Sequence, residues 1–228
     1  MLLEVKNLTK TFHKAGTNLV AVDDVNFSIK EGECVGLIGE SGCGKSTVAN
    51  LVAGFIRPDA GTISFERKLL KWKGRDARRD RRNMQMVFQN PHTSFNPRMT
   101  IGENLSEAVI YYEKDRKAGL TARMESGLEK MGLPKEYLLK LPGELSGGEC
   151  QRAAIARALM RSPSLLICDE ATSALDVSVQ AEIMRYLMEL KGEGLSFLFI
   201  THDLMLAAMI CDRIAVMKDG KIALCDSN

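Results

Sequence analysis

One stretch of the chain, residues 39–47, constrains its fold more than any other, and it reads Gly-Glu-Ser-Gly-Cys-Gly-Lys-Ser-Thr. It matches the pattern G-x-x-x-x-G-K-[ST], a glycine-rich loop that joins a strand to a helix. The flanking sequence agrees, because the apolar run 34–38 reads as a short buried strand and residues 46–55 read as a helix. Strand, loop and helix in this order predict an α/β fold with a phosphate-binding loop.

Each residue type in this loop suits phosphate. Glycines let backbone N–H groups approach an anion, and the following helix adds free N–H groups and the positive end of its dipole. We expect Lys45 to reach the β- and γ-phosphates and the Ser46 hydroxyl to ligate Mg²⁺. A plain strand-to-helix turn is the weaker alternative. The residues predicted to hold the nucleotide here are Gly39, Glu40, Ser41, Gly42, Cys43, Gly44, Lys45, Ser46 and Thr47.

The composition narrows the class of protein. Of the 228 residues, 45% are hydrophobic and 26% are charged, as in ordinary soluble domains, and the net charge of +2 gives no argument for nucleic acid. No apolar run reaches the ~18 residues of a membrane span, and the first residues do not read as a signal peptide. Six scattered cysteines without a C-x-x-C pair argue against zinc and disulfides and indicate reducing cytosol.

The first third of the chain also carries strand patterns. Residues 2–12 and 25–29 alternate apolar and polar side chains, so we expect half-buried and antiparallel strands, with another strand near residues 63–65. Phe12 has two interpretations, an aromatic platform for adenine or a core residue. The run 67–82 holds nine Lys or Arg against two Asp, which favours a solvated face over a nucleic-acid patch.

Between about Asn90 and Ser162 the strand patterns give way to helical patterns. Helical patterns at 101–112 and 121–131 indicate an α-helical insertion between the two halves of one α/β sheet. Within it, residues 145–149 read Leu-Ser-Gly-Gly-Glu and open a helix that runs to about residue 161. This start is either a helix cap or a second anion-binding site, and the cap is favoured on its own.

Two acidic residues follow a continuous apolar run. Residues 165–168 are typical of a buried parallel strand, and Asp169 and Glu170 come directly after it. Open α/β sheets bind ligands at the carboxyl ends of their strands. We therefore expect Asp169 to hold Mg²⁺ and Glu170 to act as general base, with a solvated pair of acids as the alternative.

His202 follows residues 195–200, a further predicted buried strand. It should therefore lie at the sheet edge where Asp169 also lies, and a γ-phosphate contact is favoured over a purely structural role. A helix is predicted between these strands, ending near Gly194, and the last strands are expected at 214–217 and 221–224.

With Gln89 at the end of a predicted strand, these motifs occur in an order that resembles the ATP-binding cassette (ABC) ATPases over nearly the whole chain. The resemblance implies a P-loop NTPase (RecA-like) α/β core with an antiparallel β subdomain and an inserted α-helical subdomain. It predicts a single domain, 1–228. The nucleotide-binding core comprises 1–89 and 163–228, and the helical subdomain that carries the signature motif is 90–162.

The same resemblance assigns roles. Residues 39–47 form the Walker A loop, Asp169 is the Walker B aspartate and Glu170 is the catalytic base. Gln89 is the Q-loop glutamine and His202 the switch histidine. The predicted catalytic residues are Lys45, Gln89, Glu170 and His202. The predicted Mg²⁺ ligands are Ser46, Gln89 and Asp169. In this family the signature residues Ser146, Gly147 and Gly148 close on ATP bound to the other subunit.

A finer resemblance points to the oligopeptide/dipeptide/nickel importer subfamily, carried by residues 86–91, 94–100 and 173–180. It implies an ATPase at the cytoplasmic face of a bacterial plasma membrane that uses ATP and Mg²⁺ to power uptake of peptides or of nickel and other metal chelates. The expected partners are a second ABC ATPase subunit, two permease subunits and, indirectly, an external solute-binding protein. A heterodimer is expected, and a homodimer stays open.

Two departures from the family pattern matter. Glu149 stands where glutamine is usual, so the charge either weakens the ATP site that uses this signature or is tolerated as a helix-stabilising acid. The sequence also ends at Asn228, whereas this subfamily commonly has a C-terminal extension, and we leave open whether the chain is naturally short.

Two other functions are alternatives to this one. An ABC ATPase acting on the ribosome or on nucleic acid usually has two cassettes or a long coiled coil. A nucleotide sensor without hydrolysis is disfavoured by Glu170 and His202. The sequence leaves the transported solute open.

Overall fold

The computed structural model describes residues 1–14, 17–72, 77, 79, 81–110, 119–172 and 175–227. Its central sheet has six strands in the order β10-β9-β3-β8-β7-β6. All neighbours in it are parallel except β9 and β10, which form an antiparallel pair. The strands are β3 (Cys34–Ile38), β6 (Met84–Val87), β7 (Leu165–Asp169), β8 (Ser196–Thr201), β9 (Arg213–Lys218) and β10 (Lys221–Ser227).

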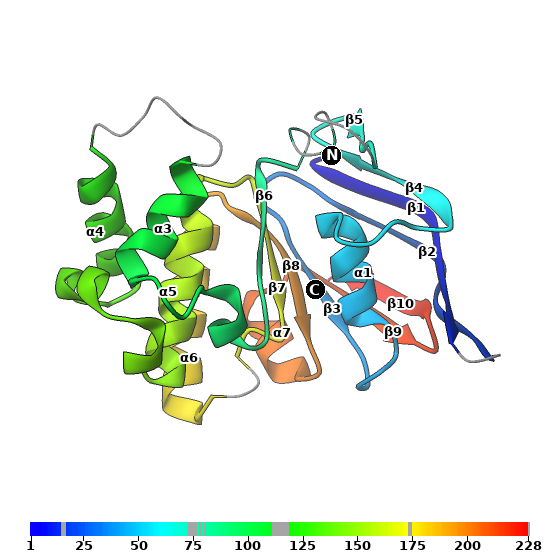
Figure 1. Cartoon of the computed structure of the whole chain (residues 1–228). Coiled ribbons are helices and arrows are strands. Elements are labelled where there is room, and N and C mark those ends of the chain that lie inside the picture. Colours follow the sequence, from blue (N-terminus) through cyan, green and yellow to red (C-terminus); the bar gives the residue numbers. More distant parts are fainter. Residues whose placement is uncertain are drawn as a thin grey trace.

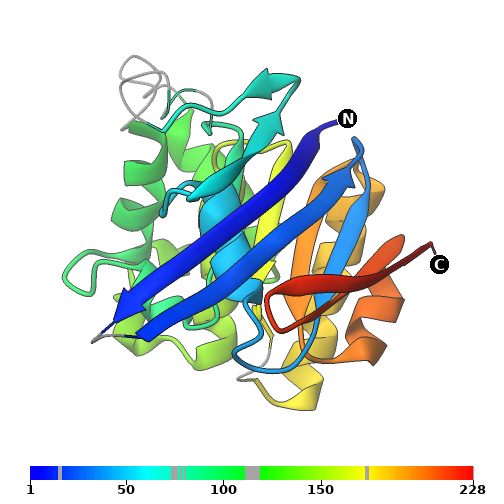
Figure 2. The same cartoon turned by 90° about the vertical axis from the view of Figure 1, so that its right-hand side faces the viewer.

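A second sheet is antiparallel and has four strands in the order β2-β1-β4-β5. It covers one side of the molecule, with the long β1–β2 ribbon crossing in front of the central sheet (Figure 2). The helix α1 (Lys45–Ala53) lies between the two sheets (Figure 1). The strands are β1 (Leu3–Lys14), β2 (Thr17–Ile29), β4 (Ala60–Phe65) and β5 (Lys68–Leu69).

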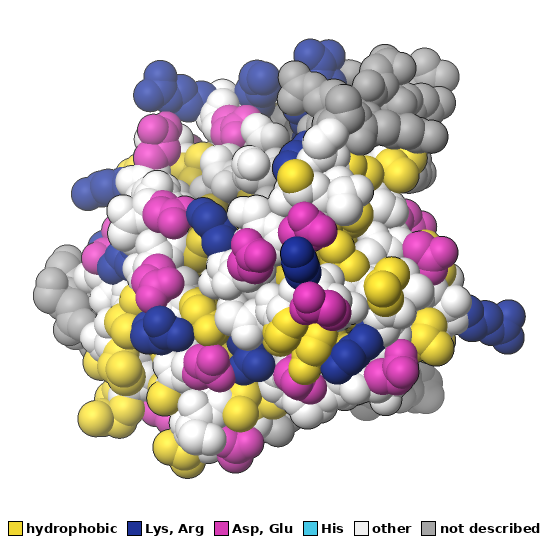
Figure 3. Space-filling view, turned by 90° about the vertical axis from the view of Figure 1, so that its left-hand side faces the viewer, with side chains coloured by type: hydrophobic (Ala, Val, Ile, Leu, Met, Phe, Trp, Pro, Cys, Tyr) yellow, Lys and Arg dark blue, Asp and Glu magenta, His cyan; other side chains and the backbone are white. Residues whose placement is uncertain are grey.

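The helices α3 to α7 lie on the far side of the central sheet from α1 (Figure 1). The helices are α3 (Ile101–Ile110), α4 (Leu120–Lys130), α5 (Gly147–Leu159), α6 (Val177–Gly192) and α7 (Leu204–Ile210). Three short 3-10 helices occur at Pro91–Ser94, Lys135–Leu139 and Pro142–Glu144. The described side chains on this face mix acidic and basic groups (Figure 3).

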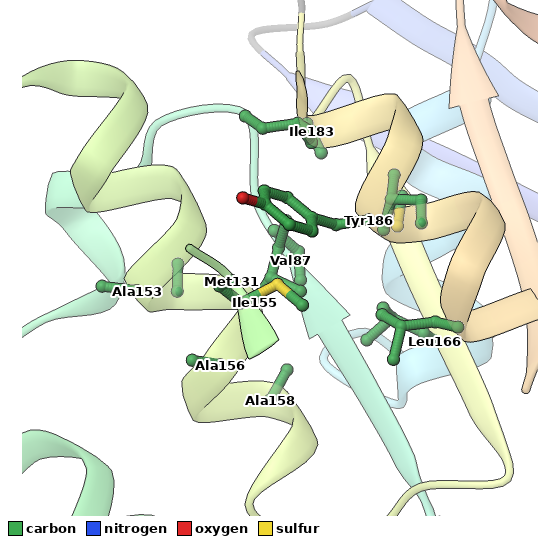
Figure 4. Close-up of a cluster of buried hydrophobic side chains, with 14 of the residues drawn as sticks. Val87, Met131, Ala153, Ile155, Ala156, Ala158, Leu166, Ile183 and Tyr186 are labelled. Carbon is green, nitrogen blue, oxygen red and sulfur yellow. The ribbon is translucent and has the colours of Figure 1, made fainter. Parts of the chain in front are cut away.

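The central strands are buried on both faces, and alternate residues serve two hydrophobic cores. Ile167 of β7 and Ile200 of β8 belong to the core that contains α1 and the antiparallel sheet. Leu166 and Phe199 belong to the core shared with the helices. In that second core, Tyr186 of α6 projects toward α5 (Figure 4). A strand with two apolar faces is what the unbroken apolar run 165–168 predicts.

The predicted α/β fold class is confirmed, and so are most of the predicted elements. The strand expected at 25–29 begins earlier, at Thr17, because β2 pairs along the length of β1 through several register shifts. The helix predicted at 101–112 is observed to Ile110, and residues 111–112 lie outside the described part. Within the basic run 67–82, residues 73–76, 78 and 80 also lie outside it. The boundaries of a helical subdomain at 90–162 stay a prediction.

The sequence reasoning missed α7. Its residues, Leu-Met-Leu-Ala-Ala-Met-Ile, form a continuous apolar run without the polar face that gives a helix its period. The residue before the helix, Asp203, could have indicated its start, because aspartate is a common helix cap. In the structure Asp203 accepts hydrogen bonds from the N–H groups of Met205 and Leu206. None of the helices within the described residues is long and apolar enough to cross a membrane.

Candidate nucleotide site

The glycine-rich loop connects β3 to α1 at the carboxyl end of the central sheet. A Cβ atom at Gly44 would overlap the carbonyl oxygen of Ala21 in β2, and one at Gly39 would overlap that of Met217 in β9. Gly44 also has φ of 112°, a left-handed conformation that other residues rarely adopt. These two glycines are therefore required by the close approach of neighbouring strands, and they hold the loop against both sheets.

Lys45 is the buried cation of this loop. Its side chain is only 3% exposed, and its Nζ donates to the carbonyl oxygens of Gly39, at 2.7 Å, and Glu40, at 2.8 Å. A buried ammonium needs such partners because desolvation of an unpaired charge is very costly. The loop thus orients a positive charge at the position where the sequence predicts phosphate.

Ser46 and Asp169 meet across the site. The Ser46 hydroxyl donates to Asp169 Oδ1 at 3.0 Å, although 123 positions separate them in the chain. Burial raises the pKa of Asp169, and the hydrogen bond from Ser46 opposes that shift. Hydroxyl and carboxylate oxygens are hard ligands of the type that Mg²⁺ prefers, and Mg²⁺ usually takes only one or two carboxylates beside phosphate and water. The residues present fit this ion.

Glu170 is the centre of the site. Its Oε2 accepts a hydrogen bond from Gln89 Nε2 at 3.0 Å, and its Oε1 lies 3.7 Å from His202 Nδ1 and 3.9 Å from Lys45 Nζ. The backbone of Glu170 has φ of 48°, an uncommon conformation for a residue other than glycine, which turns the chain directly after β7. A carboxylate with a cation, an amide and an imidazole around it suits proton transfer.

The topology explains why these residues meet. The strands β3, β8, β7 and β6 are adjacent and parallel, so their carboxyl ends share one edge. The loop with Lys45 and Ser46 follows β3, and the other residues follow β6, β7 and β8. The structure thus brings together Lys45, Ser46, Gln89, Asp169, Glu170 and His202. Their individual roles stay predictions.

Phe12 lies near this edge on the β1–β2 ribbon. It pairs with Leu19 across the ribbon, and the ribbon touches the loop through Ala21. Its side chain is 39% exposed, with Lys10 Nζ 5.7 Å from the ring centroid, so it is no core residue. The exposed ring leaves the predicted adenine platform open as its role.

The signature residues lie on the helical side instead. Ser146 caps α5, because its Oγ accepts from the Glu149 N–H at 3.3 Å and its own N–H donates to Glu149 Oε2 at 2.8 Å. This reciprocal pair is a capping box. Gly147 and Gly148 are the first two residues of α5, where N–H groups have no partner within the helix. The predicted cap is confirmed, and the predicted contact with a second nucleotide stays a prediction.

Gly148 is also a packing glycine, and its replacement by alanine should destabilise the protein. A Cβ there would overlap the Cγ1 atom of Val179 on α6, and a β-branched side chain cannot turn away easily. We expect Gly148→Ala to lower the free energy of unfolding by about 1–3 kcal/mol. Denaturant unfolding measures this. Adding Val179→Ala should restore much of the loss, whereas an equal loss in the double variant would contradict the packing explanation.

The sequence reasoning missed the polar residues that hold the segment after Gln89. Asn104 of α3 is 1% exposed, accepts from the Asn96 N–H at 2.8 Å and donates to the carbonyl of Thr100 at 2.9 Å. Arg157 of α5 donates to the carbonyl of Ser94. The sequence did contain one indication, an asparagine among the core positions of a predicted helix. Buried polar groups are almost always hydrogen-bonded, so this asparagine could have been expected to bind nearby backbone groups.

Comparison with known proteins agrees with this geometry. The family model described as ABC transporter matches residues 22–173. The oligopeptide transport ATP-binding protein OppF of Streptococcus mutans is 43% identical over 225 residues, which cover 97% of this chain and 73% of the relative. OppF of Escherichia coli is also 43% identical, over 95% of this chain and 66% of its own length.

Solved structures show the same architecture. The ATP-binding cassette MJ0796, solved as a dimer in a post-hydrolysis state with ADP and Pi, superposes with a TM-score of 0.90 at 31% identity, covering 99% of this chain and 98% of its own. A cassette from Clostridium perfringens, cbiO1 of the ABC transporter complex cbiONQ, gives a TM-score of 0.87 at 29% identity, covering 99% and 88%.

Fold and site together define a nucleotide-binding ATPase cassette of the P-loop type. The chain belongs to the ABC transporter family, as one of its ATP-binding and ATP-hydrolysing cassettes. The predicted resemblance to the oligopeptide importer ATPases is confirmed by the two OppF relatives.

Proposed function

We propose that this chain is the ATP-hydrolysing subunit of a bacterial importer that takes up peptides. The observation that carries this proposal is the 43% identity to an oligopeptide transport ATP-binding protein across 97% of the chain. Nickel or another metal chelate is the alternative cargo. The site described here handles only the nucleotide, so the solute is selected by other subunits.

Hydrolysis proceeds by positioning and charge stabilisation. Glu170 takes the proton of the attacking water, with Gln89 holding its Oε2 and His202 beside its Oε1. Lys45 and His202 place positive or hydrogen-bonding groups at the γ-phosphate. Ser46, Asp169 and Gln89 would hold Mg²⁺, which when bound neutralises phosphate charge. The exposed ring of Phe12 stacks on adenine.

A second cassette completes the site. The signature residues lie at the start of α5, on the other face of the central sheet from α1, and the similar cassette MJ0796 is dimeric with ADP and Pi bound. ATP on this chain is therefore closed by a partner's signature motif, and Ser146, Gly147 and Gly148 serve the partner's nucleotide. A heterodimer with a related ATPase is our proposal, and two copies of this chain are the alternative.

The dimer works at the cytoplasmic face of the plasma membrane on two permease subunits, supplied by an external solute-binding protein. An aromatic pair beside the site, with one exposed ring and one half-buried ring, supports such docking. Phe55 is 62% exposed, and its ring centroid lies 5.8 Å from that of Phe88, the residue before Gln89. Exposed apolar patches often mark protein interfaces, and this ring could form part of one. Residues 89–98 would transmit the motion.

Steady-state ATPase activity tests the proposal. We would measure the purified chain alone and mixed with the ATPase encoded beside it, and then uptake of labelled peptide or nickel by vesicles containing the whole complex. Activity that arises only on mixing supports the heterodimer, and activity of the chain alone supports two copies. Complete complexes that hydrolyse ATP without peptide uptake would overturn the peptide assignment.

A further inference from the structure

Glu149, the acid at an unusual position of the signature, has both carboxylate oxygens engaged. Its Oε2 accepts from the Ser146 N–H at 2.8 Å, and its Oε1 accepts from the Tyr137 hydroxyl at 2.7 Å. These hydrogen bonds, from Tyr137 first and then Ser146, lower the pKa of Glu149 to about 2. The carboxylate is therefore ionised at neutral pH, with two donors directed at it.

Tyr137 anchors this contact in the helical layer. It belongs to the 3-10 helix Lys135–Leu139, and Lys140 Nζ lies 3.5 Å above its ring. The carbonyl of Lys140 in turn accepts from the N–H of Ile101 at the start of α3. A continuous set of contacts thus runs from α3 through Tyr137 and Glu149 to the first turn of α5.

The capping box also decides which N–H groups remain for a ligand. The N–H of Ser146 donates to Glu149, and the N–H of Glu149 donates to Ser146 Oγ. The N–H of Cys150 donates to the Ser146 carbonyl within the helix. Within the described part of the chain, the N–H groups of Gly147 and Gly148 are left at the helix start, next to the positive end of the dipole.

We infer that Glu149 is a positioning residue, held by Tyr137, that fixes the signature turn so that the N–H groups of Gly147 and Gly148 face a partner's γ-phosphate. This inference rests on the proposed function. Glu149 acts by accepting hydrogen bonds, and its charge is directed toward Tyr137 and Ser146. A glutamine serves equally well, because its Oε1 can accept from the Ser146 N–H while its Nε2 donates to the tyrosine oxygen.

Three variants test the inference in the active dimer. Tyr137→Phe removes one of the two hydrogen bonds to the Glu149 carboxylate, and Glu149→Ala removes both, so turnover should fall about tenfold in the first variant and at least tenfold in the second. Glu149→Gln should stay within about twofold of the original protein. Combining Tyr137→Phe with Glu149→Ala should lower turnover no further than Glu149→Ala alone, because coupled residues are not additive.

Further measurements separate positioning from general damage. ATP affinity, measured in a Glu170→Gln background, should stay unchanged, because the chain's own ATP binds at the loop 39–47. Tyr186→Phe is the matched control, since the Tyr186 hydroxyl donates to Glu182 Oε1 at 3.1 Å away from the signature. Hydrogen exchange of the nucleotide-free chain should rise at residues 145–150 in Tyr137→Phe and not in the control.

Two results would overturn the inference. A clear rise in turnover for Glu149→Gln would show that the acid repels phosphate. Unchanged hydrogen exchange at residues 145–150 in Tyr137→Phe would show that the tyrosine does not hold the turn. If the original protein hydrolyses no ATP, either alone or mixed with the ATPase encoded beside it, the proposed function fails. Hydrogen exchange would still decide whether Tyr137 and Glu149 order the signature turn.

Discussion

Replacing Glu170 by glutamine should lower ATP turnover by about 10²–10⁴-fold, the contribution of a positioned general base. The carboxylate lies 3.7 Å from His202 Nδ1 and accepts from Gln89 Nε2 at 3.0 Å, so it is oriented before ATP arrives. A glutamine has the same shape and cannot take a proton from water. ATP binding should therefore change little, since the proposed phosphate contacts are made by the loop 39–47 and not by Glu170.

Phosphate release and ATP titration, measured on the same preparation, check this result. Glu193→Gln is the matched control, because Glu193 pairs with Lys130 on the surface and is 59% exposed. Exposed ion pairs contribute little to stability, so this variant should behave as the original protein does. Loss of ATP binding in proportion to loss of turnover in Glu170→Gln would contradict the assigned role.

Replacing Lys45 by alanine should weaken ATP binding about 100-fold or more, as expected for loss of charge-assisted hydrogen bonds worth about 1.5–3 kcal/mol each. Lys45 is buried and donates to two loop carbonyls, so its removal deletes the proposed phosphate contact and also leaves the carbonyls of Gly39 and Glu40 without this donor. The first effect weakens the contact with ATP directly, and the second loosens the loop that ATP binding needs in an ordered form.

Isothermal titration with ATP measures the affinity, and thermal unfolding shows whether the variant is folded. Lys191→Ala is the matched control, since Lys191 Nζ also donates to a carbonyl, that of Ile210, and to Asp212, both at 2.7 Å. It lies near the other end of the central sheet, so ATP affinity should not change. A folded Lys45→Ala protein with near-normal affinity would refute the role of this lysine.

Much of the fold could be predicted because its signals are local. The glycine-rich loop lies between a strand and a helix that adjoin it in sequence, and the apolar run 165–168 alone indicates a strand buried on both faces. The helix α7 was missed since its seven residues are all apolar and lack a period. The early start of β2 was missed because pairing with β1, and not its own pattern, extends that strand.

The candidate site was predicted in its members but not in its geometry. Asp169 and Glu170 were expected at the end of a strand. The direction of the Glu170 carboxylate depends on a backbone φ of 48°, and a glutamate in the sequence does not predict that conformation. Tyr137 carried no signal at all in the sequence. Its hydroxyl matters only because the 3-10 helix that contains it folds against the start of α5.

The sequence by itself determined the phosphate-binding loop, the buried central strands, the capped start of α5 and membership of the ABC transporter family. These follow from patterns within about ten neighbouring residues or from motif order. Only the tertiary structure decided that Ser46 meets Asp169 across 123 positions, that Gln89 meets Glu170 across 81, and that Glu149 turns to Tyr137. The physical reason is that parallel strands align their carboxyl ends whatever the length of chain between them, and local propensity carries no information about that distance.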